Sequence, residues 1–122
     1  MVNVPLLQKV LDHITAHPEE WRQSDWASKS ACGTAYCVAG HAVVMSGYTA
    51  SFSSKNWATG FCVKDGRRGH IDTVAREVLG LDLWQAQDLF HGRNTMQEIW
   101  DIATEITDGE IVVPFEYQRD TE

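Results

Sequence analysis

The stretch from Cys32 to Gly47 constrains this chain most, because small and apolar residues are denser there than anywhere else. Thr34 is the predicted N-cap of a helix, since its hydroxyl can accept from the free N–H groups of a first turn. Gly47 is the predicted stop, because glycine takes the left-handed conformation after a helix without steric cost. Gly40 inside a helix costs about 1 kcal/mol relative to alanine, which indicates close packing. We therefore expect a buried central helix.

Apolar residues also recur at helical spacing on both sides of this stretch. Pro18 should end the first helix, because proline lacks an N–H and restricts the residue before it. Asp82 with Gln85, and Thr95 with Glu98, have the spacing of capping boxes that begin helices. The sequence therefore predicts helices over Pro5 to His17, Thr34 to Ser46, Asp72 to Leu79, Leu83 to His91 and Met96 to Thr107.

The segment from Tyr48 to Gly69 has no helical period and is rich in Ser, Gly and Asn, so it is predicted to be irregular. Asp65-Gly66 gives a weak hairpin signal, because the arm that follows is polar and rich in glycine. The length of 122 residues predicts one domain, with a frayed tail at 116–122. The expected fold is mostly α: a compact single-domain bundle of about five helices around a buried central helix, with at most a small β-hairpin.

Composition and charge argue against two classes of partner, nucleic acids and membranes. The formal charge is -7 and the pI about 5.1, so phosphate backbones are repelled and we expect no nucleic acid. No apolar run approaches the length of a bilayer span, so we expect no membrane association. The three cysteines and the lack of a signal-peptide pattern favour the cytoplasm. The oligomeric state is left open.

Cys32, Cys37 and His41 form a C-x4-C-x3-H cluster. On a helix, Cys37 and His41 would share a face, because they are four residues apart. A zinc site needs a further ligand, and no pair spacing selects one. The candidates for it are Cys62, His70 and His91. We therefore expect a structural motif of Cys32, Gly33, Thr34, Cys37, Gly40 and His41 with small buried thiols, and no bound metal or cofactor. A zinc-stabilised module is an alternative.

A cysteine nucleophile is the second alternative. Cys32 precedes the predicted helix, whose dipole would stabilise a thiolate. His70 and Asp72 would then supply the base and its orienting carboxylate. Papain-like enzymes place that histidine on a strand, and this chain is predicted to have little strand. A thiol-dependent hydrolase using Cys32 or Cys37 with a histidine therefore stays an alternative, and no catalytic residue is assigned.

The remaining histidines and aromatic residues give one candidate surface. His13, His17 and His91 are expected to be exposed helix-end residues, and the tryptophans to lie in the core or at its edge. Those tryptophans are Trp57, Trp84 and Trp100. Aromatic residues among serines and glycines have the composition of many recognition surfaces. The candidate partner surface is Tyr48, Phe52, Trp57 and Phe61, unless these rings cover the core.

A series of motifs spans most of the chain outside residues 48–69 and the tail. In order they are His17-Pro18-Glu19-Glu20-Trp21, Gln23, Trp26, Cys32-Gly33-Thr34, Cys37, Ala39-Gly40, Ala42, Leu79-Gly80-Leu81, Ala86, Leu89-Phe90 and Asn94. The series resembles a HPEEW...CGTxxCxAGxA pattern in small uncharacterised proteins of actinobacteria and their phages. The resemblance transfers no activity and no catalytic residue. In those proteins the position of His41 is often aromatic, commonly Trp, which implies a packing role.

These observations predict a small cytoplasmic, phage-encoded protein that acts by binding another protein of the host or the phage. The argument is mainly one of exclusion, because no cofactor loop, metal cage or catalytic set emerges from the sequence. An acidic DNA mimic is disfavoured, because the carboxylates are spread among apolar residues rather than gathered in a dense ladder.

Overall fold

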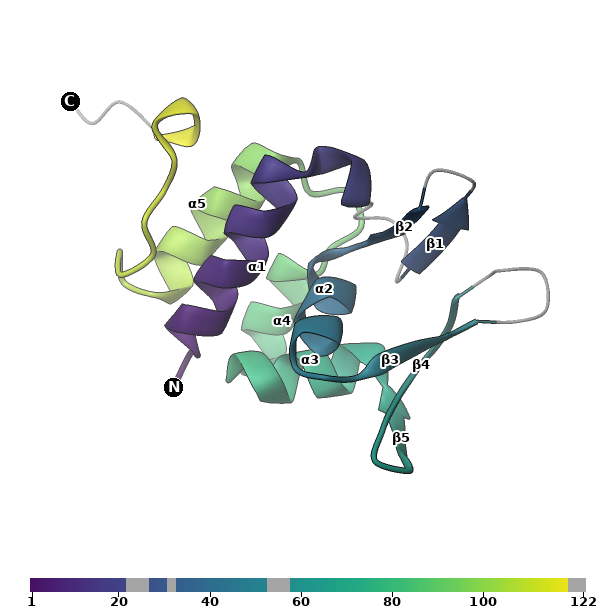
Figure 1. Ribbon diagram of the computed structural model, residues 1–122. Helices are drawn as coiled ribbons and strands as arrows, with labels where there is room; N and C mark the ends of the chain where they lie inside the picture. The colour runs from purple at the N-terminus through teal and green to yellow at the C-terminus, as the bar shows by residue number, and fades with distance from the viewer. Residues whose placement is uncertain (22–26, 31–32, 53–57, 119–122) are drawn as a thin grey trace.

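The computed structural model of the chain describes residues 1–21, 27–30, 33–52 and 58–118. Helices gather on one side of the molecule and strands on the other (Figure 1). The helices of the described part are α1 (Val4–Ala16), α2 (Val38–Met45), α3 (Ile71–Leu79), α4 (Leu83–Leu89) and α5 (Met96–Ile106), with short 3₁₀ turns η1 (Pro18–Glu20) and η2 (Phe115–Tyr117). The strands are β1 (Ala27–Ser30), β2 (Gly33–Tyr36), β3 (Thr49–Phe52), β4 (Ala58–Lys64) and β5 (Arg67–His70).

α1 forms where the sequence predicts it. Asn3 is its N-cap, and the side-chain oxygen accepts from the N–H of Leu6 at 3.2 Å. Its apolar stripe is fully buried and consists of Leu7, Val10, Leu11 and Ile14. Burying such side chains contributes roughly 1.5–3 kcal/mol each, so this face attaches α1 to the core.

α2 is the buried central helix, and its residues 38–43 are all buried between α1 and α3. The predicted start at Thr34 is wrong. Residues Gly33–Tyr36 pair with β1 as an antiparallel strand, so the backbone stays extended until Cys37. Cys37 is therefore the N-cap, and its Sγ accepts from the N–H of Gly40 at 3.4 Å. The described residues of the Cys-Gly-Thr motif thus belong to a strand that leads into the helix, and not to the helix itself.

The prediction of a helical bundle with at most a small hairpin is wrong. The described part of 48–69, predicted to be irregular, contributes to a three-stranded antiparallel sheet in the order β3-β4-β5, and β1-β2 forms a separate hairpin. The fold is mixed α and β. The pairing of β3 with β4 shifts between Ala50 and Phe52, an irregularity that interrupts simple alternation of apolar and polar residues.

β5 shows why the sheet escapes sequence reasoning. Its residues are mostly exposed, so they are polar and give no apolar alternation. The hairpin that joins it to β4 does carry a signal. Asp65 and Gly66 have φ of 52° and 78°, the positive values that a two-residue type I′ turn requires. The turn chemistry is therefore a better guide here than the hydrophobicity of the arm.

α3, α4 and α5 follow the predicted positions closely. Gly80 ends α3 in the left-handed conformation, with φ 69°. Asp82 with Gln85 and Thr95 with Glu98 form complete capping boxes at the starts of α4 and α5. Trp100 of α5 is fully buried, and its Nε1–H donates to Thr15 Oγ1 at 3.1 Å. Trp84 of α4 is 73% exposed, against the expectation that it belongs to the core or its edge.

The segment after α5 returns along α1. The side-chain amide of Gln8 donates to the carbonyl of Val112 at 2.9 Å, and its oxygen accepts from the N–H of Val112 at 2.7 Å. Gln97 donates to the carbonyl of Tyr117 at 2.8 Å. The tail predicted to fray, 116–122, begins within η2, and 119–122 lie outside the described residues. Among the described residues, no helix combines the length and the apolar character that crossing a membrane needs.

Candidate functional site

α3 and α4 meet at Gly80 and Leu81, and a groove of about 550 Å³ lies between them. We call it the α3–α4 groove. It is lined by Asp72, Thr73, Arg76, Leu83, Ala86, Gln87, Phe90 and His91. Pockets of about 300–1,000 Å³ are large enough to hold drug-sized ligands, so this groove has room for several side chains.

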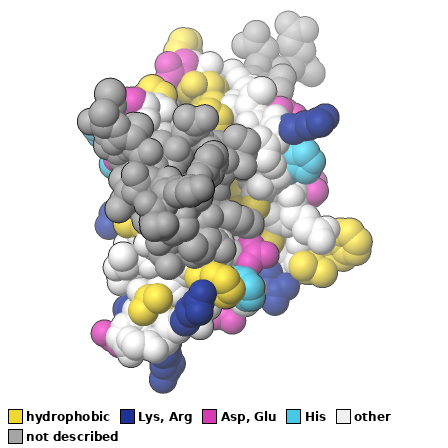
Figure 2. Space-filling view, turned by 90° about the vertical axis from the view of Figure 1, so that its right-hand side faces the viewer, with side chains coloured by type: hydrophobic (Ala, Val, Ile, Leu, Met, Phe, Trp, Pro, Cys, Tyr) yellow, Lys and Arg dark blue, Asp and Glu magenta, His cyan; other side chains and the backbone are white. Residues whose placement is uncertain are grey.

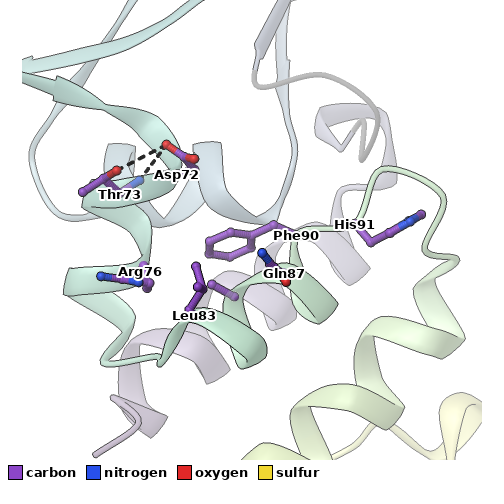
Figure 3. Close-up of a pocket in the computed structure, with 8 residues that line it drawn as sticks. Asp72, Thr73, Arg76, Leu83, Gln87, Phe90 and His91 are labelled. Carbon is purple, nitrogen blue, oxygen red and sulfur yellow. Dashed lines mark hydrogen bonds between the residues drawn. The ribbon is translucent and has the colours of Figure 1, made fainter.

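The floor of the α3–α4 groove is apolar. Ala86 is buried, Phe90 is half-buried against the core and Leu83 is 52% exposed. Figure 3 shows the ring of Phe90 between the two helices, with Leu83 and Gln87 on the α4 side. A half-exposed leucine beside a half-buried aromatic ring is apolar surface that the chain itself leaves uncovered.

The rim of the groove is polar. Arg76 lies on α3 across from Leu83, while His91 points away from the centre (Figure 3). Asp72 Oδ1 accepts from the backbone N–H of Thr73 at 2.8 Å, so this carboxylate is held at the start of α3. The rim therefore offers one carboxylate and one guanidinium beside an apolar floor.

The predicted partner surface is only partly described. Tyr48 is half-buried against the core, and the Nζ of Lys64 lies 5.5 Å from its ring centroid. Phe61 is half-buried. The guanidinium carbon of Arg68 lies 3.9 Å from its ring centroid, and the ring centroid of His70 lies 4.6 Å from it. Trp57 and the side chain of Phe52 lie outside the described residues. Figure 2 shows hydrophobic, basic and histidine side chains adjoining below the undescribed region of this face.

The structure separates the predicted cysteine–histidine cluster into different roles. Cys37 is only 3% exposed and caps α2, so a substrate cannot reach its Sγ in this conformation. Cys62 is fully buried on β4, where its Sγ lies 3.7 Å from the carbonyl of Gly69 and burial raises the pKa of the thiol. Cys32 lies outside the described residues. In the described part, Cys37 and His41 do not join Cys62, His70 or His91 in a metal-ligating group.

His41 has a structural partner. Its Nε2 donates to the backbone carbonyl of Glu20 at 2.6 Å, which joins buried α2 to the η1 turn. Burial lowers the pKa of His41, so the ring is neutral near pH 7. On the other side of the turn, Nε2 of His13 lies 3.1 Å from Oε1 of Glu20. That hydrogen bond is the main reason why the pKa of Glu20 lies below its ordinary value.

Sequence reasoning misses both the groove and the cluster around η1. The groove depends on how α3 packs against α4, which no local pattern shows. The cluster does carry a signal: His13 and His17 have the four-residue spacing that puts two imidazoles on one helix face, and Glu19-Glu20 follow shortly after. The sequence-based expectation treats these histidines as exposed helix-end residues without a joint role.

Comparison with known proteins adds no relative, because no family model, no curated protein and no solved structure matches this chain.

Proposed function

We propose that this protein acts by binding another protein, and that the α3–α4 groove receives an apolar segment of that partner. The observation that carries the proposal is Leu83, 52% exposed beside Phe90 in a groove of about 550 Å³. Apolar grooves between helices are a recurring way to bind a partner segment through a few anchoring side chains.

Two further features support a protein partner. Trp84 follows Leu83 on α4 and is 73% exposed, and tryptophan is enriched among residues that dominate binding energy. The chain carries a net charge of -7, which favours the approach of a basic partner. The proposed occupant is therefore an apolar segment flanked by basic residues, with its apolar side chains in the groove. A host or phage origin of the partner follows only from the resemblance to actinophage proteins.

The test is quantitative capture from an actinobacterial lysate with the immobilised chain and its variants. Leu83→Asp places a charge on the groove floor, and a charge that binding would bury without a partner opposes association. We expect at least about a tenfold drop in the captured partner, which corresponds to about 1.4 kcal/mol of binding free energy. Circular dichroism would establish that the variant is folded.

The matched control is Phe115→Asp, because Phe115 is 91% exposed on η2, which lies apart from α3 and α4 (Figure 1). Capture should be unchanged in this control. If folded Leu83→Asp captured every protein as well as the wild-type chain does, the α3–α4 groove would be excluded as the binding site. If Trp57→Ala alone abolished capture, the binding surface would instead be the aromatic set predicted from the sequence.

The thiol-dependent hydrolase and the zinc-stabilised module stay predictions. The burial of Cys37 argues against it as the nucleophile, while Cys32 lies outside the described residues. An activated Cys32 would be alkylated much faster than an ordinary thiol at neutral pH, because the thiolate is the reactive form.

A further inference from the structure

The end of α1 and the η1 turn bring metal-ligating side chains together. His17, Glu19 and Glu20 each place one potential ligand atom within 4.8 Å of the other two. Among the described residues, this is the set of at least three histidine, cysteine or carboxylate side chains that is compact enough to hold a metal ion. Nδ1 of His17 lies 3.4 Å from Oε1 of Glu19 and 3.7 Å from Oε2 of Glu20. The 3.4 and 3.7 Å separations match those between ligands around one small cation, whose bonds are about 2.0–2.2 Å long, whereas the third pair, within 4.8 Å, requires a small rotation of an exposed glutamate side chain.

The backbone explains the convergence. Pro18 cannot continue α1, and the chain turns tightly so that the N–H of Glu20 donates to the carbonyl of His17 at 2.9 Å. The turn brings both glutamates back toward the imidazole at the end of the helix. A residue order of one histidine, one proline and two glutamates therefore produces a compact set of one nitrogen and two carboxylate ligands.

Two buried or half-buried neighbours hold this turn in place. His13 is half-buried, and its Nε2 is hydrogen-bonded to Glu20 at 3.1 Å while its ring lies 4.8 Å from that of His17. Buried His41 reaches the carbonyl of Glu20 from α2. Metal-ligating carboxylates are themselves usually hydrogen-bonded by outer partners that fix their orientation. The turn already has such partners.

We propose that His17, Glu19 and Glu20 bind a divalent transition-metal ion, Zn²⁺ in the first instance, with His13 as the residue that positions Glu20. The ligand set decides the class of ion. Imidazole favours Zn²⁺ and its neighbours over Mg²⁺ and Ca²⁺, and carboxylates complete a site without thiolate. The side chains are 50%, 68% and 41% exposed, so water can occupy the open coordination positions.

Charge favours a cation at this place. Two carboxylates on adjacent residues repel each other, and a divalent ion between them removes that repulsion. His17 contributes its nitrogen as a ligand only when neutral. The proposal departs from the sequence-based expectation that no metal is bound, and it is independent of the α3–α4 groove.

The test uses the full, untagged chain. Calorimetric titration with Zn²⁺ should show one ion per chain, and His17→Ala and Glu20→Gln should each weaken binding at least about tenfold. His13→Phe should also weaken it by about tenfold or more, because losing an outer partner typically costs 10–100-fold in metal affinity. The controls are His91→Ala and Glu116→Gln, exposed residues of the same types elsewhere, which should not change the affinity.

Co²⁺ identifies the ligands by its absorption spectrum. Binding through nitrogen and oxygen gives no intense thiolate charge-transfer band, and this is the expected result. Such a band would place the ion on a cysteine and overturn the assignment. No measurable binding of Zn²⁺, or binding that His17→Ala and Glu20→Gln leave unchanged, would overturn it as well. Melting curves recorded without metal would establish that each variant is folded.

Discussion

His41 is a polar ring in the most buried helix of the described chain, and its position is explained by one acceptor. The neutral imidazole donates from Nε2 to the carbonyl of Glu20, so its desolvation is compensated by a hydrogen bond. Through this hydrogen bond the ring joins α2 to η1.

We predict that His41→Ala lowers the free energy of unfolding by about 1–3 kcal/mol, because it removes the donor to a partly buried carbonyl and leaves a cavity. Urea denaturation of the variant beside the wild-type chain measures this. His91→Ala removes a solvent-exposed acceptor of the Arg93 N–H and should cost clearly less than His41→Ala. If both variants lost the same free energy of unfolding, the hydrogen bond from His41 to Glu20 would make no particular contribution to stability.

The elements divide into those that local chemistry specifies and those that it does not. The positions of α1, α3, α4 and α5 are predictable, because caps and apolar stripes act within one or two turns, as at Asp82 and Thr95. The start of α2 is not, because residues 33–36 pair with β1 as a strand before the helix begins. The strands are not, because β5 is exposed and polar, and β3 is short and irregularly paired. Leu83 and Phe90 are both apolar residues of the α4 segment, yet both retain exposed surface in the α3–α4 groove. Their exposure depends on the packing of two helices rather than on either sequence segment.

The capping box of α5 carries a prediction at the level of the helix. Thr95→Ala should cost about 0.5–2 kcal/mol, as for other lost N-caps. Glu98 accepts from the N–H of Thr95, and this bond lowers the pKa of Glu98 below its ordinary value of 4.5. A carboxyl whose pKa is lowered by folding stabilises the native state above its unfolded pKa, and this contribution disappears as the pH falls through the folded pKa.

Denaturation midpoints measured from neutral to acidic pH test the predicted contribution of the Glu98 carboxylate. Glu98→Gln should flatten the loss of stability on the acid side of 4.5. Glu105→Gln, an exposed glutamate on the same helix, serves as the comparison and should keep the acid dependence of the wild-type chain. If both variants keep it, the charge on Glu98 has no measurable part in the cap.

On the scale of the whole molecule, the N-terminus packs against the end of α3. The N–H of Asn3 donates to the carbonyl of Leu79 at 2.7 Å, and its side-chain amide donates to that of Val78 at 3.0 Å. A Cβ on Gly80 would meet the backbone carbonyl of Met1. A side chain at position 80 would therefore be unfavourable for two reasons: the backbone is left-handed there, and the N-terminal residues pass too close.

Comparing Gly80 with Gly109 separates the cost of backbone strain from the cost of the steric clash with Met1. Gly109 has φ of 80°, and a Cβ added there would meet nothing within 4 Å, so Gly109→Ala tests backbone strain alone, at about 1 kcal/mol. Gly80, with φ of 69°, adds a steric clash with Met1, so Gly80→Ala should cost clearly more. Thermal denaturation of both variants compares them. Equal shifts in melting temperature would mean that the N-terminus moves aside without cost.

The contact between Gln8 and Val112 has a consequence for synthesis. The two residues are 104 positions apart, and the side-chain amide of Gln8 pairs with the Val112 backbone much as a neighbouring strand would. α1 therefore leaves the ribosome well before the segment that covers it has been made. Because so long a loop must close before this contact can form, the surroundings of α1 are completed late. Until then the side of α1 that carries Gln8 lacks this cover, whereas its apolar stripe belongs to the core that α1 forms with α2, α3 and α5.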